Sequence, residues 1–272
     1  MTESIIKCPI CGEYLEKENR QMFCSNKHSF DIAKQGYVNL LISNKQKDLH
    51  HGDSAEMLQA RKDILHNGYY SVIADELVKT ISKKESGLNI LDVGTGIGYY
   101  VKEVKNNVPL NTYYGLDISK KGVLEASKLD KEMNWIVGSG SKLPFMDESI
   151  DLIISVFSPI DEAEFSRVLK PSGTLLVVSP NENHLYELKE ACYETVLPRE
   201  YDKNELVTHF DKNESKNISK SEMFKKEHLK SLLMMTPHYW RTTLESKEKL
   251  YALDELKVNI DVVLNIYKKR PN

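Results

Sequence analysis

Three cysteines and one histidine near the start of the chain have the spacing of a metal site. Cys8, Cys11, Cys24 and His28 follow the pattern C-x2-C-x12-C-x3-H. Two ligands two residues apart can hold one ion from a tight turn, and a second pair on a facing hairpin completes a tetrahedron. Three thiolates and one imidazole suit Zn²⁺ and leave no open coordination position. The pattern therefore predicts a structural zinc site, which can supply folding energy that so small a module lacks.

Two other interpretations of this cluster are weaker. Three unrelated buried cysteines would rarely fall into two paired spacings within so short a segment. A catalytic zinc deaminase needs an H-x-E element for its general acid and base, and the sequence contains no His-x-Glu. The remaining cysteine, Cys192, stands alone, and we expect a buried core residue there rather than a nucleophile.

A glycine-rich turn forms the second candidate site. An apolar run over residues 89–93 leads into Gly94-Thr-Gly96-Ile-Gly98, with Asp92 just before the first glycine. Glycines let the backbone turn sharply and approach a ligand closely. Asp117 follows about 20 residues later, at the end of the next expected strand, where a carboxylate can accept both hydroxyls of a ribose. The turn alone fits S-adenosylmethionine or a dinucleotide.

Three later segments distinguish between S-adenosylmethionine and a dinucleotide as the cofactor. They are Ser139-Gly-Ser141, which lies where adenine would bind, a Leu143-Pro-Phe segment that leads to Asp151-Leu-Ile, and Lys170-Pro-Ser-Gly173. A dinucleotide-binding domain would not explain the last two. The ordered series resembles the class I S-adenosylmethionine-dependent methyltransferases over residues 89–179, and this resemblance implies a Rossmann-like α/β fold.

Alternating strands and helices must position these residues. Apolar runs indicate five strands, and helices are expected between them, which is typical of a parallel sheet covered on both faces. The first helix is expected to begin at Asp53, which has capping-box spacing to Glu56, and to stop at Asn67-Gly68. The expected strands cover residues 89–93, 113–117, 135–137, 151–157 and 173–179, and the expected helices include 71–82, 119–129 and 162–169.

The chain divides into two predicted domains. Residues 1–43 form a zinc-binding module, residues 44–52 read as a polar linker, and residues 53–272 form the methyltransferase domain, with its core at 89–180. Residues 199–230 are rich in Lys, Glu and Asn and are expected to form a lid, an insertion or solvated helices.

Composition narrows the class of protein. Hydrophobic residues make up 40% of the chain and charged residues 28%, so a packed core is expected and gross disorder is not. No run of about 18 apolar residues occurs, so we expect no membrane span. Without a signal-peptide core at the start, a cytoplasmic location is the default expectation. A net charge of −3 argues against a protein that simply coats a polyanion, although a local basic patch would suffice to bind RNA.

The flanking segments resemble, nearly end to end, one family, the bacterial 23S rRNA (guanine-N1)-methyltransferases. The matching stretches are Cys8-Pro-Ile-Cys11, Cys24 to Leu41, Gly52 to Arg61, Pro180 to Leu188, and Met235-Thr-Pro237 with Trp240. The resemblance implies methyl transfer from S-adenosylmethionine to a guanine in a hairpin of 23S rRNA. It also implies that Tyr70, Gly98, Tyr99 and His184 contact the cofactor, and that the zinc module recognises RNA. Lys34, Lys45 and Lys47 are candidate phosphate contacts, and ordinary solubilising lysines are an equal alternative.

The segment after the fourth expected strand bears on the acceptor atom. It reads Phe157-Ser158-Pro159 and lacks the second proline and the aromatic residue typical of enzymes that methylate exocyclic amines. Asp161 follows as a candidate general base, and a helix N-cap is an equally good interpretation of it.

Two rival functions stay open. One is a methyltransferase of small metabolites whose zinc module serves oligomerisation. The other is a non-catalytic zinc-ribbon binding protein, which the intact glycine turn and Asp117 disfavour. The sequence allows a homodimer.

Overall fold

The apolar runs in the middle of the sequence form the central strands of a large sheet. The computed structural model describes residues 4–42, 54–196, 206 and 208–271. All five predicted strands are present, because strands buried on both faces require continuous apolar sequence. The last of them begins earlier than predicted. They are β5 (Asn89–Val93), β6 (Thr112–Asp117), β7 (Asn134–Val137), β8 (Ile150–Val156) and β9 (Leu169–Pro180).

The sheet has eight strands in the order β10-β11-β9-β8-β5-β6-β7-β4. The strands from β4 (Tyr37–Asn39) to β9 are parallel, and β11 (Glu255–Lys269) and β10 (Phe210–Lys225) complete it with antiparallel pairing. The predicted α/β Rossmann-like architecture is confirmed. The carboxyl ends of the parallel strands meet at one edge, where ligands of such sheets bind.

Helices cover one face of the sheet throughout. Alternate side chains of each strand point to opposite faces, and Ile90, Leu152 and Ile154 are buried with side chains of three helices. These helices are α2 (Ser71–Ile81), α3 (Tyr99–Asn107) and α4 (Lys120–Leu129). The glycine-rich turn connects β5 to α3.

The opposite face is covered differently. Here α5 (Glu162–Val168) packs under the sheet, but residues 138–149, which connect β7 to β8, contain no helix. Leu143 and Phe145 from this connection are buried together with Cys8 and Leu15. The N-terminal module thus shares a core with the large sheet and covers the part of this face that has no helix of its own.

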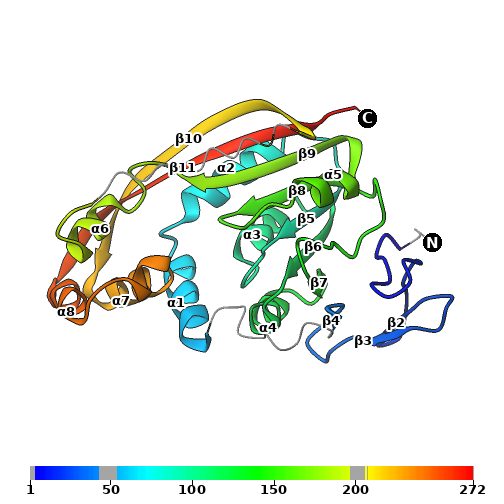
Figure 1. Ribbon diagram of the computed structural model, residues 1–272, viewed down its shortest axis with the longest axis horizontal. Helices are drawn as coiled ribbons and strands as arrows, with labels where there is room; N and C mark the ends of the chain where they lie inside the picture. The colour runs from blue at the N-terminus through cyan, green and yellow to red at the C-terminus, as the bar shows by residue number, and fades with distance from the viewer. Residues whose placement is uncertain (1–3, 43–53, 197–205, 207, 272) are drawn as a thin grey trace.

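The N-terminal module is a small three-stranded sheet. Its strands β1 (Glu16–Glu18), β2 (Gln21–Phe23) and β3 (Ser29–Asp31) are antiparallel neighbours. The next strand, β4, leaves the module and pairs in parallel with β7 at the edge of the large sheet. Figure 1 shows the module at one end of the molecule and the helices that follow β9 at the other.

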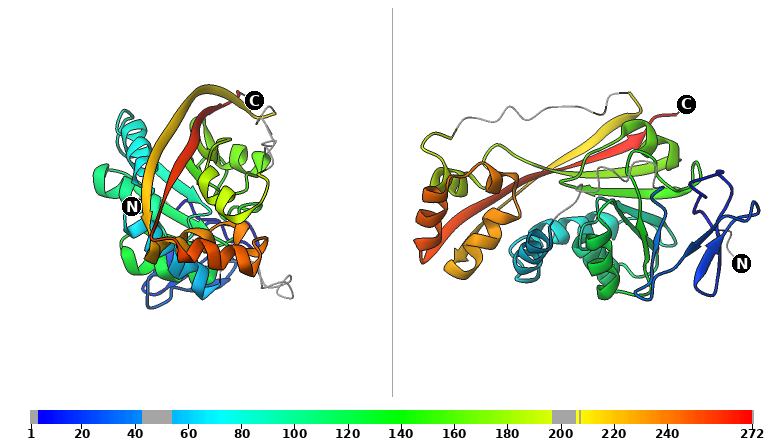
Figure 2. Two further views of the ribbon diagram at one scale, coloured as in Figure 1. Left: turned by 90° about the vertical axis from the view of Figure 1, so that its left-hand side faces the viewer. Right: turned by 60° about the horizontal axis from the view of Figure 1, so that its bottom comes forward.

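The C-terminal third differs from its sequence prediction. Residues 210–225 are not solvated helices but the strand β10, which forms a long curved hairpin with β11 (Figure 2). Residues 199–205 lie outside the described residues. The hairpin carries at its far end α7 (Lys226–Met234), the short 3-10 helix η2 (Pro237–Trp240) and α8 (Leu244–Ala252), beside α6 (Tyr186–Cys192). Cys192 is buried there, as predicted.

The first helix, α1 (Ala55–His66), begins two residues later than predicted. Its N-cap is Ser54, whose hydroxyl accepts a hydrogen bond from the Met57 amide at 3.2 Å. Asp53 lies outside the described residues, as does the predicted linker, residues 44–52. Asn67 caps the other end and Gly68 follows at φ +78°, so the predicted stop is confirmed. No helix in the described part of the chain is long and apolar enough to cross a membrane.

Candidate functional site

The four predicted zinc ligands lie together. All four ligand atoms are within 4.8 Å of one another. Cys11 Sγ is 3.6 Å from Cys24 Sγ, and His28 Nδ1 is 3.7 Å from Cys8 Sγ and 3.4 Å from Cys24 Sγ. A tetrahedron with Zn–S bonds near 2.3 Å and a Zn–N bond near 2.0 Å has edges of about 3.5–3.8 Å. The donor set and its spacing therefore fit one zinc ion in a closed site.

Tight turns present these ligands. Gly12, at φ +86°, donates its amide to the Cys8 carbonyl at 2.9 Å, and Lys27, at φ +63°, donates to the Cys24 carbonyl at 2.9 Å. Burial raises the pKa of the Cys8 thiol, whereas the backbone amide of Glu13 is the main cause that lowers the pKa of Cys11 to about 6. Each turn holds one pair of ligands, as the paired spacings predict.

The module is attached to the loop that carries the Leu143-Pro-Phe segment. The Lys7 amide donates to the Pro144 carbonyl at 2.9 Å, and the Met146 amide donates to the Ile5 carbonyl at 3.0 Å. Arg167 fixes the same loop from α5, through bonds of 2.9 Å to the carbonyls of both Leu143 and Phe145. This segment therefore attaches the zinc module to the sheet.

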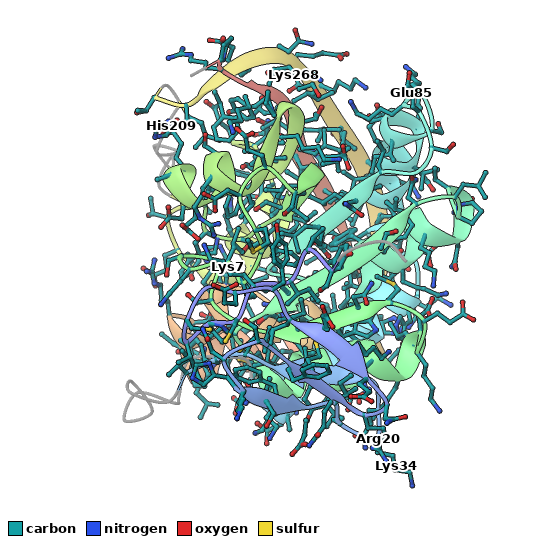
Figure 3. All side chains as sticks on the ribbon, turned by 90° about the vertical axis from the view of Figure 1, so that its right-hand side faces the viewer. Lys7, Arg20, Lys34, Glu85, His209 and Lys268 are labelled. Carbon is teal, nitrogen blue, oxygen red and sulfur yellow. The ribbon has the colours of Figure 1, made fainter. Side chains whose placement is uncertain are left out.

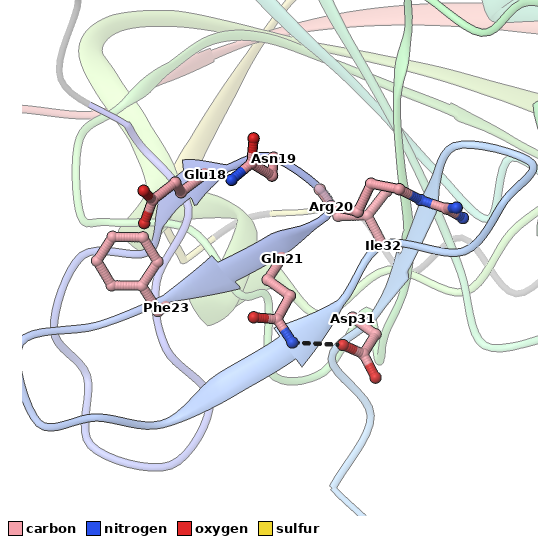
Figure 4. Close-up of a pocket in the computed structure, with 7 residues that line it drawn as sticks. All are labelled: Glu18, Asn19, Arg20, Gln21, Phe23, Asp31 and Ile32. Carbon is pink, nitrogen blue, oxygen red and sulfur yellow. Dashed lines mark hydrogen bonds between the residues drawn. The ribbon is translucent and has the colours of Figure 1, made fainter.

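A surface hollow lies on the outer side of the module (Figure 4). Gln21 donates to Asp31 at 2.8 Å across two of its strands, and Arg20 projects from the turn at one side. The hollow therefore presents charged groups of both signs rather than a basic face. Its lining residues are Glu18, Asn19, Arg20, Gln21, Phe23, Asp31 and Ile32.

The glycine-rich turn lies at the carboxyl end of β5 and is fixed by Asp117. One oxygen of this carboxylate accepts the Gly96 amide at 2.8 Å, and the other accepts the Ser119 amide at 2.7 Å. Gly94 has φ +77°, and a Cβ atom there would stand 2.1 Å from Ser158 Oγ, so no larger residue fits. The loops after β5, β6 and β8 thus meet around this turn.

Asp92 is a buried carboxyl group beneath the turn. It accepts a hydrogen bond from Thr95 Oγ1 at 2.6 Å. Burial raises the pKa of Asp92 to about 7, and the negative charge of Asp117 adds to the increase. A group so poised near neutral pH favours a bound cation, because a positive charge nearby would stabilise the carboxylate.

Three rings from distant parts of the chain meet beside this turn. Tyr70, the N-cap of α2, lies 6.4 Å from Phe157 and 6.1 Å from His184 between ring centroids, and Phe157 is 5.6 Å from His184. Burial lowers the pKa of His184 to about 3. Its Nδ1 accepts the Asp261 amide at 3.3 Å, so the neutral ring carries its proton on Nε2.

Two more predicted residues lie at the edges of this region. Tyr99 is in the first turn of α3, with its ring 5.1 Å from that of Tyr100, and burial raises its pKa to about 12. Asp161 is the N-cap of α5, where Oδ1 accepts the Glu164 amide at 3.1 Å. The capping interpretation of Asp161 is therefore confirmed.

Sequence reasoning gave no role to Thr95, Ser158 or the Phe157 ring. Thr95 and Ser158 stand at the ends of apolar strands, where polar residues of a parallel sheet gather, and that signal could have found them. Phe157 gives no such signal, because its left-handed backbone and its ring contacts are visible only in three dimensions.

Comparison with known proteins matches both parts of the chain. The family model “RlmA, N-terminal”, a zinc ribbon, matches residues 6–48, and the model “Methyltransferase domain” matches residues 91–177. The chain is 30% identical to a Micromonospora griseorubida protein, over 98% of this chain and 97% of the relative. That relative is named “Putative 23S rRNA (guanine-N(1)-)-methyltransferase”. A Streptomyces fradiae protein, named 23S rRNA (guanine(748)-N(1))-methyltransferase, is 32% identical over 68% of this chain and 67% of its own length.

Solved structures support the fold. A “putative methyltransferase” from Bacillus halodurans superposes with a TM-score of 0.53 at 16% identity, over 72% of this chain and 98% of that one. At such identity the likeness bears on architecture alone.

Proposed function

Because the chain belongs to the family of bacterial 23S rRNA (guanine-N1)-methyltransferases, we propose that it methylates N1 of a guanine in a hairpin of 23S rRNA. The observation that carries this proposal is similarity along the whole chain, 98% of it in one relative, which includes both the zinc ribbon and the methyltransferase domain. A methyltransferase of small metabolites would share only the methyltransferase domain with this chain and not the zinc ribbon.

We propose that S-adenosylmethionine binds at the glycine-rich turn. The backbone of Gly94, Gly96 and Gly98 would line the site, and Asp117 would accept the ribose hydroxyls. Two observations fit a cofactor that carries a sulfonium cation. Nothing lies within 4 Å of a Cβ built on Gly96, so the turn has open space there, and the buried carboxyl group of Asp92 has a pKa near 7. Tyr70, Asp92, Tyr99 and His184 are the proposed side-chain contacts.

The proposed reaction is an in-line displacement. When bound, the cofactor supplies an electrophilic methyl group, and the protein contributes position and electrostatics. Guanine N1 carries a proton and faces the pairing partner, so the base must be unpaired or flipped before N1 can be reached. We therefore expect the substrate to be a loop or an opened junction rather than an intact duplex.

We propose Asp161 as the group that accepts the N1 proton, although its capping bond already gives it a structural role. Asp161→Asn separates the two roles, because asparagine caps helices as well as aspartate but cannot accept a proton. A large loss of kcat with an unchanged Tm would support the base, and full activity would leave only the cap.

Nucleoside mass spectrometry tests the function. Unmodified 23S rRNA is reacted with the enzyme and labelled cofactor, and label is expected in 1-methylguanosine. Label in N2-methylguanosine or an adenosine product would overturn the acceptor atom. Label only in small metabolites would favour the first rival function, and no transfer to any acceptor would favour the non-catalytic one.

We propose that the zinc module selects the RNA and takes no part in the chemistry. Arg20 accepts the Ile32 amide at its carbonyl, and the side chains of Arg20 and Lys34 extend from the same end of the module (Figure 3). These two cations are candidate phosphate contacts. Lys45 and Lys47 lie outside the described residues.

A cytoplasmic location and a homodimer complete the proposal. The cytoplasm of a bacterium holds the ribosomal substrate.

The proposed dimer rests on exposed apolar residues. Trp240 and Leu244 are 71% and 74% exposed at the helical end of the molecule, and large exposed apolar groups often mark contact surfaces. Sedimentation equilibrium tests the dimer, and a monomer at micromolar concentration would refute it.

A further inference from the structure

We propose that Phe157 is the surface on which the target guanine stacks while its N1 is methylated. This inference rests on the proposed function and names the residue that would hold the base. Four observations carry it: the backbone of Phe157, the exposure of its ring, the rings beneath it, and its closeness in space to the cofactor turn.

The backbone of Phe157 is held in a conformation that a side chain disfavours. Its φ is +53°, in the left-handed region that glycine adopts without strain. The neighbouring bonds maintain this conformation, since the Phe157 amide donates to the Val178 carbonyl at 3.1 Å and Ser155 Oγ donates to the Ser158 carbonyl at 3.4 Å. Such strain persists where the surroundings over-determine it, and it concentrates at functional sites.

The strained turn holds a phenyl ring in solvent. Phe157 is 42% exposed, whereas Tyr70, which contacts it edge-on, is 1% exposed. The exposed part of the ring leaves a flat apolar surface open to a partner with a flat apolar face. Bases provide such faces, and stacking on an aromatic side chain is the usual way in which proteins hold an unpaired base.

The rings beneath Phe157 give it a rigid and uncharged support. His184 lies 5.6 Å away at an interplanar angle of 35°, and burial keeps its pKa near 3, so the imidazole is neutral. Tyr70 closes the cluster from α2. A base that stacks on Phe157 would therefore meet a fixed platform rather than a mobile side chain.

The platform adjoins the cofactor turn. Ser158, the next residue, lies so close to Gly94 that a Cβ on Gly94 would overlap its hydroxyl. A base on Phe157 would thus be held beside the loop where the methyl donor is proposed to bind.

Phe157→Gly tests the inference, because it removes the ring and relieves the backbone strain together. We expect an unchanged or higher Tm and a cofactor Kd within about twofold of wild type. The KM for 23S rRNA should rise by about 5- to 150-fold, the range expected for the loss of one stacked base. Phe157→Trp should retain a KM near wild type.

Glu148→Gly is the matched control. Glu148 has φ +51°, so its replacement relieves similar strain elsewhere, and rRNA methylation should be unchanged. A Phe157→Gly enzyme with wild-type KM for rRNA, or one that loses cofactor affinity in proportion to activity, would overturn the platform while the proposed function stands. Failure of the wild-type enzyme to form 1-methylguanosine would remove the proposed function and the platform with it.

Discussion

Replacing Asp117 should weaken cofactor binding and loosen the glycine-rich turn at the same time. Its two oxygens accept the Gly96 and Ser119 amides at 2.8 and 2.7 Å, and the ribose hydroxyls are proposed as further donors. Hydrogen bonds to a charged group contribute about 1.5–3 kcal/mol each. Loss of the ribose contact in Asp117→Ala should therefore raise the Kd for S-adenosylmethionine by about 10- to 150-fold.

The folding effect can be measured separately from the binding effect. Two backbone amides lose their acceptor in Asp117→Ala, and each costs about 1–3 kcal/mol if water does not replace it. Asp117→Asn keeps one acceptor oxygen, so its Tm should lie between those of wild type and Asp117→Ala. Calorimetric titration gives the Kd, and thermal unfolding gives the stability.

Asp130 supplies a matched control. Hydrogen bonds from Lys105 and Lys102 at 2.8 and 2.9 Å lower the pKa of this carboxyl to about 2, against the effect of its partial burial. Asp130→Asn should lower the Tm and leave the cofactor Kd unchanged. If Asp117→Ala folds and binds S-adenosylmethionine as tightly as wild type, Asp117 does not bind the ribose and the reasoning fails.

Three further predictions follow from the same geometry. Cys24→Ser should abolish stoichiometric zinc binding, as metal analysis would show. It should also lower the single unfolding temperature of the chain, because Cys24 lies in a core shared with the sheet. A separate unfolding transition for the module would contradict this prediction. Gly94→Ala should abolish cofactor binding, since its Cβ would overlap Ser158. Gly87→Ala is the control, because Gly87 has a similar φ of +81° and open space around it, and this change should cost only modest stability. Equal cofactor affinity in both variants would contradict cofactor binding at the glycine-rich turn. Burial raises the pKa of Asp92 to about 7, so its ionisation in the free protein costs stability as pH rises from about 4 through 7. A bound cation favours the ionised form, so cofactor affinity should rise by up to about tenfold between pH 6 and 8 and then level off. Titrations of Asp92→Asn should show no such rise.

The core of the fold could be predicted from sequence because its strands are buried on both faces. The outer hairpin was missed for a different reason. Most side chains of β10 are exposed, so its sequence resembles a solvated helix. β11 did carry a signal, since Val258, Ile260, Val262 and Leu264 alternate with less buried residues at the period of a strand.

The candidate site was predictable only where its residues follow strands. The glycine turn, Asp92 and Asp117 are adjacent because neighbouring parallel strands end at the same edge. The cluster of Tyr70, Phe157 and His184 depends on three remote segments. His184 is held by a bond from β11, a strand that was not predicted, so no local pattern could place it.

The pairing of β4 with β7 has a consequence for the order of folding during synthesis. The four ligands of the zinc module emerge first from the ribosome and can close around their ion alone. Val38, in the next strand, pairs with Ile136, which is made about 100 residues later, or about 5–20 s at ordinary rates of synthesis. Until then β4 has no partner strand and the core that the module shares with the sheet is incomplete, so the zinc site can close before the module is fully packed.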